Sequence, residues 1–525
     1  MNTFVRRFAA LVTGVLSGLD RLVFRGHLRQ LSYTHGMNCY LSANRILLKD
    51  FGQHAEQVTA QLLDASLAQA RQSGREIRYL NSSQLCKEDI ARDIAQRDGI
   101  DTGLICVLTC VEPCLSFEVH RNRARKRLEL QARRRKCRYL YHYYHHPLFG
   151  FMHARLQTWF PFPIQVCLNG REWLARQMDQ AGLAYQRRGN CFPWLADLER
   201  ARALFDQQLT VAWPQLLAGL RRDLHPAHPD LLGRLPLDYY WSVHQSEWAS
   251  DLMFRCRDDL ETVYPRLVRH ALTTYDSAAV MRFLGRRLTA SGQVHGQFDG
   301  EVMSDGRRRV EGVRVKHQVN GNSVKMYDKG SVLRIETTLN EVRDFKVYRT
   351  KENEPDGELD WRVLRKGVAD LHRRAEVSQA CNERYGEALA TVSAATPLRE
   401  WAEPLCQRVA EPGKPAGRQL RALNPLGAAD AALLEAVGRP EFLVNGLRNR
   451  DLVGILYGQP TEDAAEQRRR SSRVTRHLRL LRAHGVLQKV AKTHRYLVSP
   501  KGRQVITALL AARAANTDTL TSNAA

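Results

Sequence analysis

The sequence lacks several features that would assign a function at once. No apolar run approaches the roughly 20 residues that a membrane-spanning helix needs. There is no glycine-rich phosphate-binding loop and no glycine-rich dinucleotide motif, which argues against an ATP-driven or nicotinamide-dependent enzyme. The eleven cysteines form no Cys-x2-Cys pair and are odd in number, a pattern that disfavours a zinc site or a disulfide framework. Cys106, Cys110 and Cys114 fall in an apolar stretch, where cysteine serves as a small core residue.

Acidic residues are also in short supply. The chain has 55 Asp and Glu against 79 Lys and Arg, which leaves a net charge of +24. Such a surplus favours a polyanionic partner, because neutralised phosphates release condensed counterions. An anionic membrane surface is the weaker alternative, because no spanning segment accompanies the charge. We therefore expect a soluble cytoplasmic protein that associates with the nucleoid and has no membrane partner.

Length and hydrophobic patterning predict a chain of several globular domains. The expected fold class is α+β: a multidomain chain with a mixed body of helices and antiparallel sheets, followed by a C-terminal winged helix-turn-helix. Helices are predicted at 40–75, 195–290 and 361–394, and strands at 104–168 and at 294–350 around the turn Asn320-Gly321-Asn322. The expected division is 1–200 (α/β domain with a basic, aromatic strand region), 201–395 (α+β domain with a helical bundle and a hairpin sheet), 396–425 (linker), 426–515 (winged helix-turn-helix) and 516–525 (disordered tail).

Residues 426–515 carry the clearest order of structural signals. Helices are predicted at 428–437, at 450–457 with Asn449 as its cap, at 466–484 and at 504–513. Two strands, 486–490 and 495–498, flank a short turn between the third and fourth helices. The order of helix, helix, helix, hairpin and helix is that of a winged helix-turn-helix.

The third of these helices is predicted to have an apolar face and a basic face. Val474, Leu478 and Leu481 recur at helical spacing and should pack inward. Arginine binds guanine edges and phosphates in a bidentate manner, so basic side chains outside that stripe are predicted to contact duplex DNA. The predicted contacts are an arginine at every third helix position, Arg470, Arg473, Arg476, Arg479 and Arg482, and the hairpin residues Lys492, His494 and Arg495.

A family resemblance supports this interpretation of the C-terminal region. The stretch VTRHLRLLRAHGVLQKVAKTHRYLVSPKGRQVITALL, residues 474–510, resembles the MarR- and ArsR-type winged-helix repressors. The resemblance implies DNA binding, with the third helix in the major groove and the hairpin as a wing. It covers the C-terminal domain and carries no implication for the residues before it.

A second basic region lies in the first strand-rich segment. Its predicted nucleic-acid contacts are Arg121, Arg123, Arg125, Arg133, Arg134 and Arg135. Tyr139, Tyr141, Tyr143 and Tyr144 follow directly. Basic residues next to aromatic ones suit a surface for single-stranded DNA or RNA, on which bases stack. The alternative is that the aromatic rings fill a core while the arginines face water.

The strongest candidate for an active site lies at residues 315–349. Tyr327 is the candidate nucleophile, Asp328 and Glu336 would hold Mg²⁺ or Mn²⁺, and Lys329 or Arg334 would contact the phosphate. The string YDK…LRIETT, residues 327–338, is similar to strings in rolling-circle replication initiators, which implies phosphodiester cleavage. The alternatives are a polar hairpin packed on its domain, or a clamp for DNA phosphates. A nuclease centre of the RNase H or restriction-endonuclease kind would instead use Asp20 and Glu112, at the ends of predicted strands.

These observations predict a nucleic-acid-binding protein that docks on duplex DNA through its C-terminal domain. Its expected role is in the replication, transposition or maintenance of a mobile element. The alternatives are a metal-dependent nickase, nuclease or transposase, and a transcriptional regulator. Single-stranded DNA and RNA are further candidate partners, Mg²⁺ or Mn²⁺ is expected only for an enzyme, and the sequence does not fix the oligomeric state.

Overall fold

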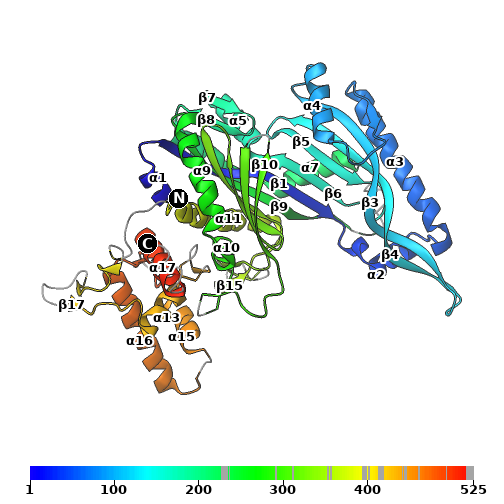
Figure 1. Cartoon of the computed structure of the whole chain (residues 1–525). Coiled ribbons are helices and arrows are strands. Elements are labelled where there is room, and N and C mark those ends of the chain that lie inside the picture. The colour runs from blue at the N-terminus through cyan, green and yellow to red at the C-terminus, as the bar shows by residue number, and fades with distance from the viewer. Residues whose placement is uncertain are drawn as a thin grey trace. The chain divides into compact units, whose positions relative to one another are not determined.

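The computed structural model describes residues 1–525 apart from 226–234, 236, 290–291, 310–311, 352–353, 355–356, 393–398, 400–401, 412–418, 440, 443–445, 459–460, 492 and 516–525. The fold is mixed α/β, with helices beside one large sheet (Figure 1). The chain divides into two compact units. One comprises Met1–Val15, Ala249–Arg365 and Arg373–Ala525, and the other comprises Leu16–Trp248 and Lys366–His372.

The large sheet has eleven strands in the order β10-β11-β12-β13-β9-β1-β6-β5-β4-β3-β2. Its central strands, β1 (Val12–His27) and β9 (Tyr240–Phe254), each run from one unit into the other. The sequence predicted antiparallel sheets. The sheet is instead mixed, because β2 (Ile77–Tyr79) pairs in parallel with β3 (Gly103–Asn122).

The unit that contains Leu16–Trp248 is built on β1 to β6. Its two longest strands, β3 and β4 (Arg127–His146), pair as a hairpin over nearly their whole length, so the short runs expected from the sequence form one continuous ribbon. The remaining elements are β5 (Gly150–Gln157), β6 (Ile164–Asn169), β7 (Tyr185–Arg188), β8 (Cys191–Leu195), α2 (Thr34–Ala43), α3 (Phe51–Gln72), α4 (Lys87–Arg97), α5 (Gly170–Gln180), α6 (Leu198–Asp206) and α7 (Trp213–Leu224).

The other unit packs helices on one face of β9 to β13. Its core contains Val324 and Met326 of β12, Leu333 and Ile335 of β13, and Tyr385 of α11. The turn between β11 and β12 is the one predicted from the sequence, with Asn320 at φ 50°, a conformation that asparagine tolerates. The elements are α1 (Asn2–Arg7), α9 (Arg257–Thr273), α10 (Ser277–Phe283), β10 (Val302–Arg309), β11 (Gly312–Val319), β12 (Asn322–Asp328), β13 (Val332–Leu339), β14 (Lys346–Arg349), β15 (Asp360–Val363) and α11 (Leu371–Leu389).

The prediction of helix throughout 195–290 is wrong at its centre, where β9 lies. The segment from Tyr240 to Val243 has two aromatic residues and one β-branched residue, which favour a strand. Burial then extends from Trp248 to Phe254 on both sides of the strand, as expected at the centre of a sheet. A short buried segment of this kind cannot be told from a buried helix by periodicity alone.

From α13 onward the C-terminal elements follow in the predicted order, whereas β16 and β17 lie within the predicted linker. These elements share a hydrophobic core, against which Trp361 of β15 also packs. They are β16 (Val409–Ala410), β17 (Gln419–Leu420), α13 (Ala428–Val437), α15 (Asn449–Tyr457), α16 (Ala464–Ala483), β18 (Leu487–Lys489), β19 (Tyr496–Val498) and α17 (Pro500–Ala514). The predicted cap is displaced by one residue: Arg448 is the N-cap, and Asp451 accepts a hydrogen bond from its backbone nitrogen. The Asn449 side chain instead donates to α16, at Ser471 and Thr475. The predicted disordered tail, 516–525, lies outside the described residues.

Candidate functional site

The arginines of α16 do not form a single row. Steps of three residues rotate the side chain by about 60° around a helix, so the five predicted positions spread over about 240°. Arg473, Arg476 and Arg482 are exposed to solvent. Arg469, which lies four residues before Arg473, is 79% exposed and shares the face of Arg473 and Arg476. These three arginines lie opposite the buried residues Val474, Leu478 and Leu481, which pack inward as predicted.

The other two predicted helix contacts have intramolecular partners. The Arg470 guanidinium pairs with Glu466 (Nε–Oε1 3.0 Å) and lies 5.3 Å from the ring centre of Tyr457. Arg479 lies 3.5 Å from a carboxylate oxygen of Glu411. Both side chains therefore have intramolecular acidic partners that a nucleic acid would have to displace.

The hairpin β18–β19 follows α16 directly. His494 is exposed, and Lys492 lies outside the described residues. The Arg495 guanidinium lies 4.7 Å from the ring centre of Tyr348 on β14, so it is already stacked on an aromatic ring. Of the predicted hairpin contacts that the structure describes, His494 is therefore the exposed one.

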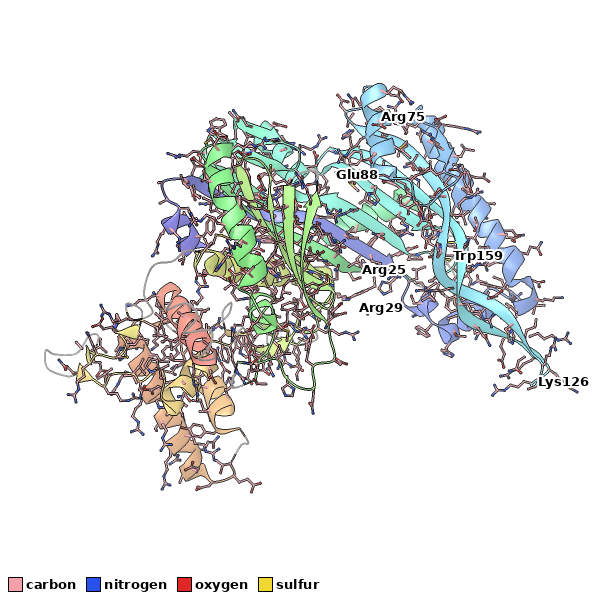
Figure 2. All side chains as sticks on the ribbon, in the orientation of Figure 1. Arg25, Arg29, Arg75, Glu88, Lys126 and Trp159 are labelled. Carbon is pink, nitrogen blue, oxygen red and sulfur yellow. The ribbon has the colours of Figure 1, made fainter. Side chains whose placement is uncertain are left out.

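The basic ribbon, which we define as β3, β4 and their turn, carries the second predicted set. Arg121, Arg123, Arg125, Arg133 and Arg134 are exposed, in the outer part of the ribbon. Figure 2 shows Lys126 at its tip, beyond α2 and α3. Arg135 is half-buried, and its guanidinium lies 4.0 Å from the ring centre of Trp159. Five of the six predicted contacts are therefore open to solvent.

The aromatic residues after this basic segment do not form a stacking surface. Tyr139, Tyr141 and Tyr143 are between 2% and 7% exposed, and Tyr144 is half-buried. The Tyr139 and Tyr141 hydroxyls donate to Gln157 and Glu112 within the protein. Of the two interpretations that the sequence left open, the structure supports the apolar core for the aromatic rings.

The candidate catalytic residues are only partly brought together. The strand register places Tyr327 opposite Arg334 and Lys325 opposite Glu336, all on one face of β12 and β13. The Tyr327 hydroxyl donates to one Glu336 oxygen, and Lys325 Nζ lies 2.7 Å from the other. Lys329 Nζ lies 5.5 Å from the Tyr327 ring centre. Tyr327 therefore contacts Glu336 through its hydroxyl and lies beside Lys329 through its ring.

Asp328 does not belong to this group. It follows Tyr327 directly on β12, so its side chain points to the opposite face of the sheet. Its Oδ1 accepts a hydrogen bond from the backbone nitrogen of Gly330 in the turn before β13. The predicted metal pair of Asp328 and Glu336 is therefore wrong, because strand alternation separates the two carboxylates.

Glu336 is a buried carboxylate whose surroundings favour the ionised form. Burial opposes its ionisation, but the charges of Lys325 and Arg334 and the hydrogen bonds from Lys325 and Tyr327 outweigh that effect and lower its pKa. Arg334 in turn forms a bidentate pair with Asp251 of β9, at 2.6 and 2.9 Å. This face of the sheet therefore holds charges that compensate one another inside the protein.

The alternative pair of Asp20 and Glu112 is also wrong. Asp20 lies on β1 and Glu112 on β3, with β6, β5 and β4 between them. At about 4.8 Å per strand, that order separates the two positions by roughly 19 Å. Glu112 is instead paired with Lys87 and Arg155 and accepts a hydrogen bond from Tyr141. Asp20 accepts a hydrogen bond from Asn190 and lies 3.8 Å from Arg171.

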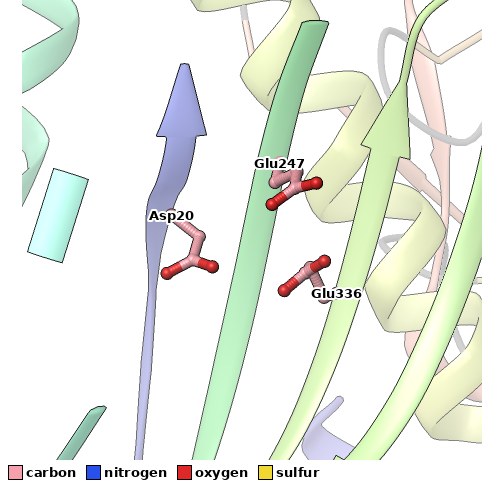
Figure 3. Close-up of side chains that lie close together, drawn as sticks. All are labelled: Asp20, Glu247 and Glu336. Atoms are coloured by element: carbon pink, nitrogen blue, oxygen red, sulfur yellow. The ribbon is translucent and has the colours of Figure 1, made fainter. Parts of the chain in front are cut away.

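A different set of carboxylates comes together on β1, β9 and β13, which are hydrogen-bonded neighbours in the sheet. One carboxylate oxygen from each of Asp20, Glu247 and Glu336 lies within 4.8 Å of the others, as Figure 3 shows. Asp20 and Glu336 are buried, and Glu247 is half-buried. We call these three residues the acidic cluster. Carboxylate oxygens at this spacing are suitable ligands for Mg²⁺ or Mn²⁺.

Glu247 is the member that sequence reasoning missed. It lies in β9, which was predicted to be helical, so no strand-end or strand-face argument pointed to it. Asp20 and Glu336 were each named, but in two separate hypotheses. Recognition of the β-type pattern at Tyr240–Val243 would have placed Glu247 on a strand of the sheet.

Comparisons with protein-family models, with curated proteins and with solved structures find no match to this chain. Its function is therefore argued from its own residues. Among the described residues, no helix combines the length and apolarity needed to cross a bilayer.

Proposed function

We propose that the protein binds duplex DNA through its C-terminal domain, which acts as a winged helix-turn-helix. The observation that carries the proposal is the exposed face of Arg469, Arg473 and Arg476 on α16, opposite the buried face of the same helix. Guanidinium groups on one face of a helix can bind guanine edges and phosphates in the major groove. The hairpin β18–β19 directly after α16 takes the place of the wing, with His494 exposed.

The rest of the chain makes a role beyond simple repression the better fit. A net charge of +24 exceeds what one recognition helix supplies, and the basic ribbon adds exposed cations elsewhere in the sequence. We propose a role in the replication, transposition or maintenance of a mobile element, with transcriptional regulation as the alternative.

Replacing Arg473 and Arg476 by alanine is expected to weaken duplex binding about thirtyfold at roughly 0.15 M salt, because each arginine neutralises one phosphate or binds one base edge. The slope of log K against log salt should fall by about 2. The measurement is fluorescence anisotropy of a labelled mixed-sequence duplex over a series of salt concentrations. The matched control is Arg92→Ala/Arg97→Ala, which removes the same charge from arginines of α4 that pair with Glu88 and Asp98. Equal effects of the two variants would contradict a recognition role for α16.

Metal-dependent cleavage of a phosphodiester is the second candidate function. The acidic cluster favours it, because three carboxylates within 4.8 Å match the oxygen ligands of a divalent cation that activates a nucleophile. Lys325 and Tyr327 are both hydrogen-bonded to Glu336, and in this proposal they would contact the phosphate or act on it. In this proposal Glu336 is a metal ligand and Tyr327 is the nucleophile or a residue that positions Glu336.

Glu336→Gln is expected to lower any Mg²⁺- or Mn²⁺-dependent cleavage by about a hundredfold or more, because the amide is a weaker ligand than the carboxylate. The assay uses labelled duplex and single-stranded DNA with each metal. Tyr327→Phe should lose cleavage completely if the phenol is the nucleophile, and only in part if it positions Glu336. Glu118→Gln, on an exposed carboxylate of the basic ribbon, is the control. Wild-type protein that cuts neither substrate with either metal would contradict this second function.

A further inference from the structure

The basic ribbon has two chemically different faces. In a paired hairpin, residues opposite one another share a face, and the faces alternate along each strand. The register pairs Glu112 with Cys137, Glu118 with Gln131 and Glu129 with His120. These three glutamates are the acidic residues of β3, β4 and their turn, and the alternation places all three on the same face.

The arginines near that face already have acidic partners. Arg125 and Arg127 lie 3.6 and 2.9 Å from Glu129, and Arg133 lies 3.7 Å from Glu118. Part of the positive charge that the sequence suggests is therefore neutralised within the ribbon itself.

The other face has no acidic residue of the ribbon. It presents three consecutive cross-strand pairs that each join an apolar residue to a cation: Leu115 with Arg134, Pro113 with Lys136, and Val111 with Arg138. All six side chains are exposed, with Leu115 at 66% and Val111 at 40%. Exposed apolar side chains of this size, held in a row beside cations, indicate a surface that contacts a partner.

We propose that this acid-free face of the ribbon binds double-stranded DNA, as a second contact surface besides α16. Arg134, Lys136 and Arg138 neutralise backbone phosphates, while Leu115 and Val111 contact the apolar edges of bases or sugars. A two-stranded ribbon fits the major groove, which is about 12 Å wide. The choice of DNA as the partner rests on the proposed function. The residues that carry the inference are different from those of α16.

The composition of this face favours a duplex over unpaired nucleic acid. Binding of unpaired bases depends on aromatic rings for stacking. The tyrosines of β4 are turned into the core or half-buried, and the apolar partners of the three cations are the aliphatic side chains of Val111, Pro113 and Leu115. The exposed ring of Tyr79 on β2 lies 5.9 Å from the Arg138 guanidinium and is, among the described residues, the one aromatic ring that the structure places against these cations. Aliphatic groups contact thymine methyls or enter between base steps in a groove.

The test removes three cations from one face and then three from the other. Arg134→Ala/Lys136→Ala/Arg138→Ala in the full chain is expected to weaken binding of a labelled mixed-sequence duplex about a hundredfold at roughly 0.15 M salt, and to lower the salt slope by about 3. Arg125→Ala/Arg127→Ala/Arg133→Ala has the same change of net charge but removes arginines that are paired with glutamates. This control should change the affinity by only a few-fold. Thermal unfolding of both variants should match that of the wild type, because the replaced side chains are exposed.

Equal affinities or equal salt slopes for the two triple variants would overturn the proposal. A loss confined to single-stranded DNA or RNA would assign the face to unpaired nucleic acid instead, and a loss confined to phosphatidylserine vesicles would assign it to a membrane surface. Combination with Arg473→Ala/Arg476→Ala separates the two surfaces. If the α16 change has no effect and the ribbon change does, the winged-helix function fails while the ribbon inference stands, and the reverse result separates them equally well.

Discussion

Asp251→Ala is expected to lower the free energy of unfolding by about 3 kcal/mol, because it leaves a buried guanidinium without its carboxylate partner. Asp251 and Arg334 are 0% and 1% exposed, and the pair is bidentate, with Nε–Oδ1 at 2.6 Å and Nη2–Oδ2 at 2.9 Å. Two charges at this depth are stable only as a pair, since each alone would carry a desolvation penalty of several kcal/mol. Guanidinium-induced unfolding followed by circular dichroism measures the change.

The control replaces both members of the pair. Asp251→Leu/Arg334→Met removes the two charges together and substitutes apolar groups of similar size, so most of the lost stability should return. If the single variant lost less than about 1 kcal/mol, the pair would have to be hydrated, and burial would be a poor guide to its energy. The Arg334 charge also lowers the pKa of Glu336, so the pair with Asp251 holds in place a cation on which that carboxylate depends.

Local signals explain what the sequence predicted well. In the C-terminal region, Gly438 directly follows α13, Gly485 comes two residues after the end of α16, and Pro500 begins α17. The helix Ala428–Val437 lies at the predicted residues, because Gly427 precedes its start and Gly438 follows its end. The hairpin at Asn320 was predicted for the same reason.

Long-range pairing explains what the sequence could not give. The neighbours β1, β9 and β13 are far apart in the chain, and no local pattern states that they pair. Asp20 and Glu336 could therefore be named singly, but their proximity could not be predicted. The error at Asp328 has another origin: two carboxylates near one hairpin were grouped by sequence distance, although adjacent residues of a strand face opposite sides.

The basic ribbon shows a third limit of sequence reasoning. Arg133, Arg135, Tyr139 and Tyr141 have the same parity on β4 and thus lie on one face. The arginines lie in the outer part of the ribbon, and the tyrosines lie in the part that packs on the core. Basic and aromatic residues that are neighbours in the sequence therefore occupy different parts of the strand and do not form one surface. The point where the core ends depends on elements such as α3 and β5, which come from other parts of the chain.

Two buried histidines predict that the protein loses stability in mild acid. His142 of β4 and His317 of β11 are both 0% exposed, and burial lowers the pKa of each to about 4. His142 Nε2 lies 3.1 Å from Ser66 Oγ, and His317 bridges Ser304 and Tyr385 at 2.8 and 3.1 Å. An imidazole in the unfolded chain titrates near 6.5, so between about pH 6.5 and 4 the unfolded state binds a proton that the folded state excludes. Stability must therefore fall as the pH falls through that range.

Each of these histidines is expected to lower the free energy of unfolding by about 2 kcal/mol between roughly pH 7.5 and 5, or about 4 kcal/mol together. The measurement is urea-induced unfolding at a series of pH values. His142→Gln and His317→Gln should each remove about 2 kcal/mol of the pH dependence, whatever their effect at neutral pH. The buried carboxylates Glu112 and Glu336, whose pKa values are lowered, contribute their pH dependence only below about pH 4.5, so the two effects separate. If both glutamine variants kept the full wild-type slope above pH 5, the imidazoles would have to gain protons inside the folded protein, and the packing around β4 and β11 would have to admit water.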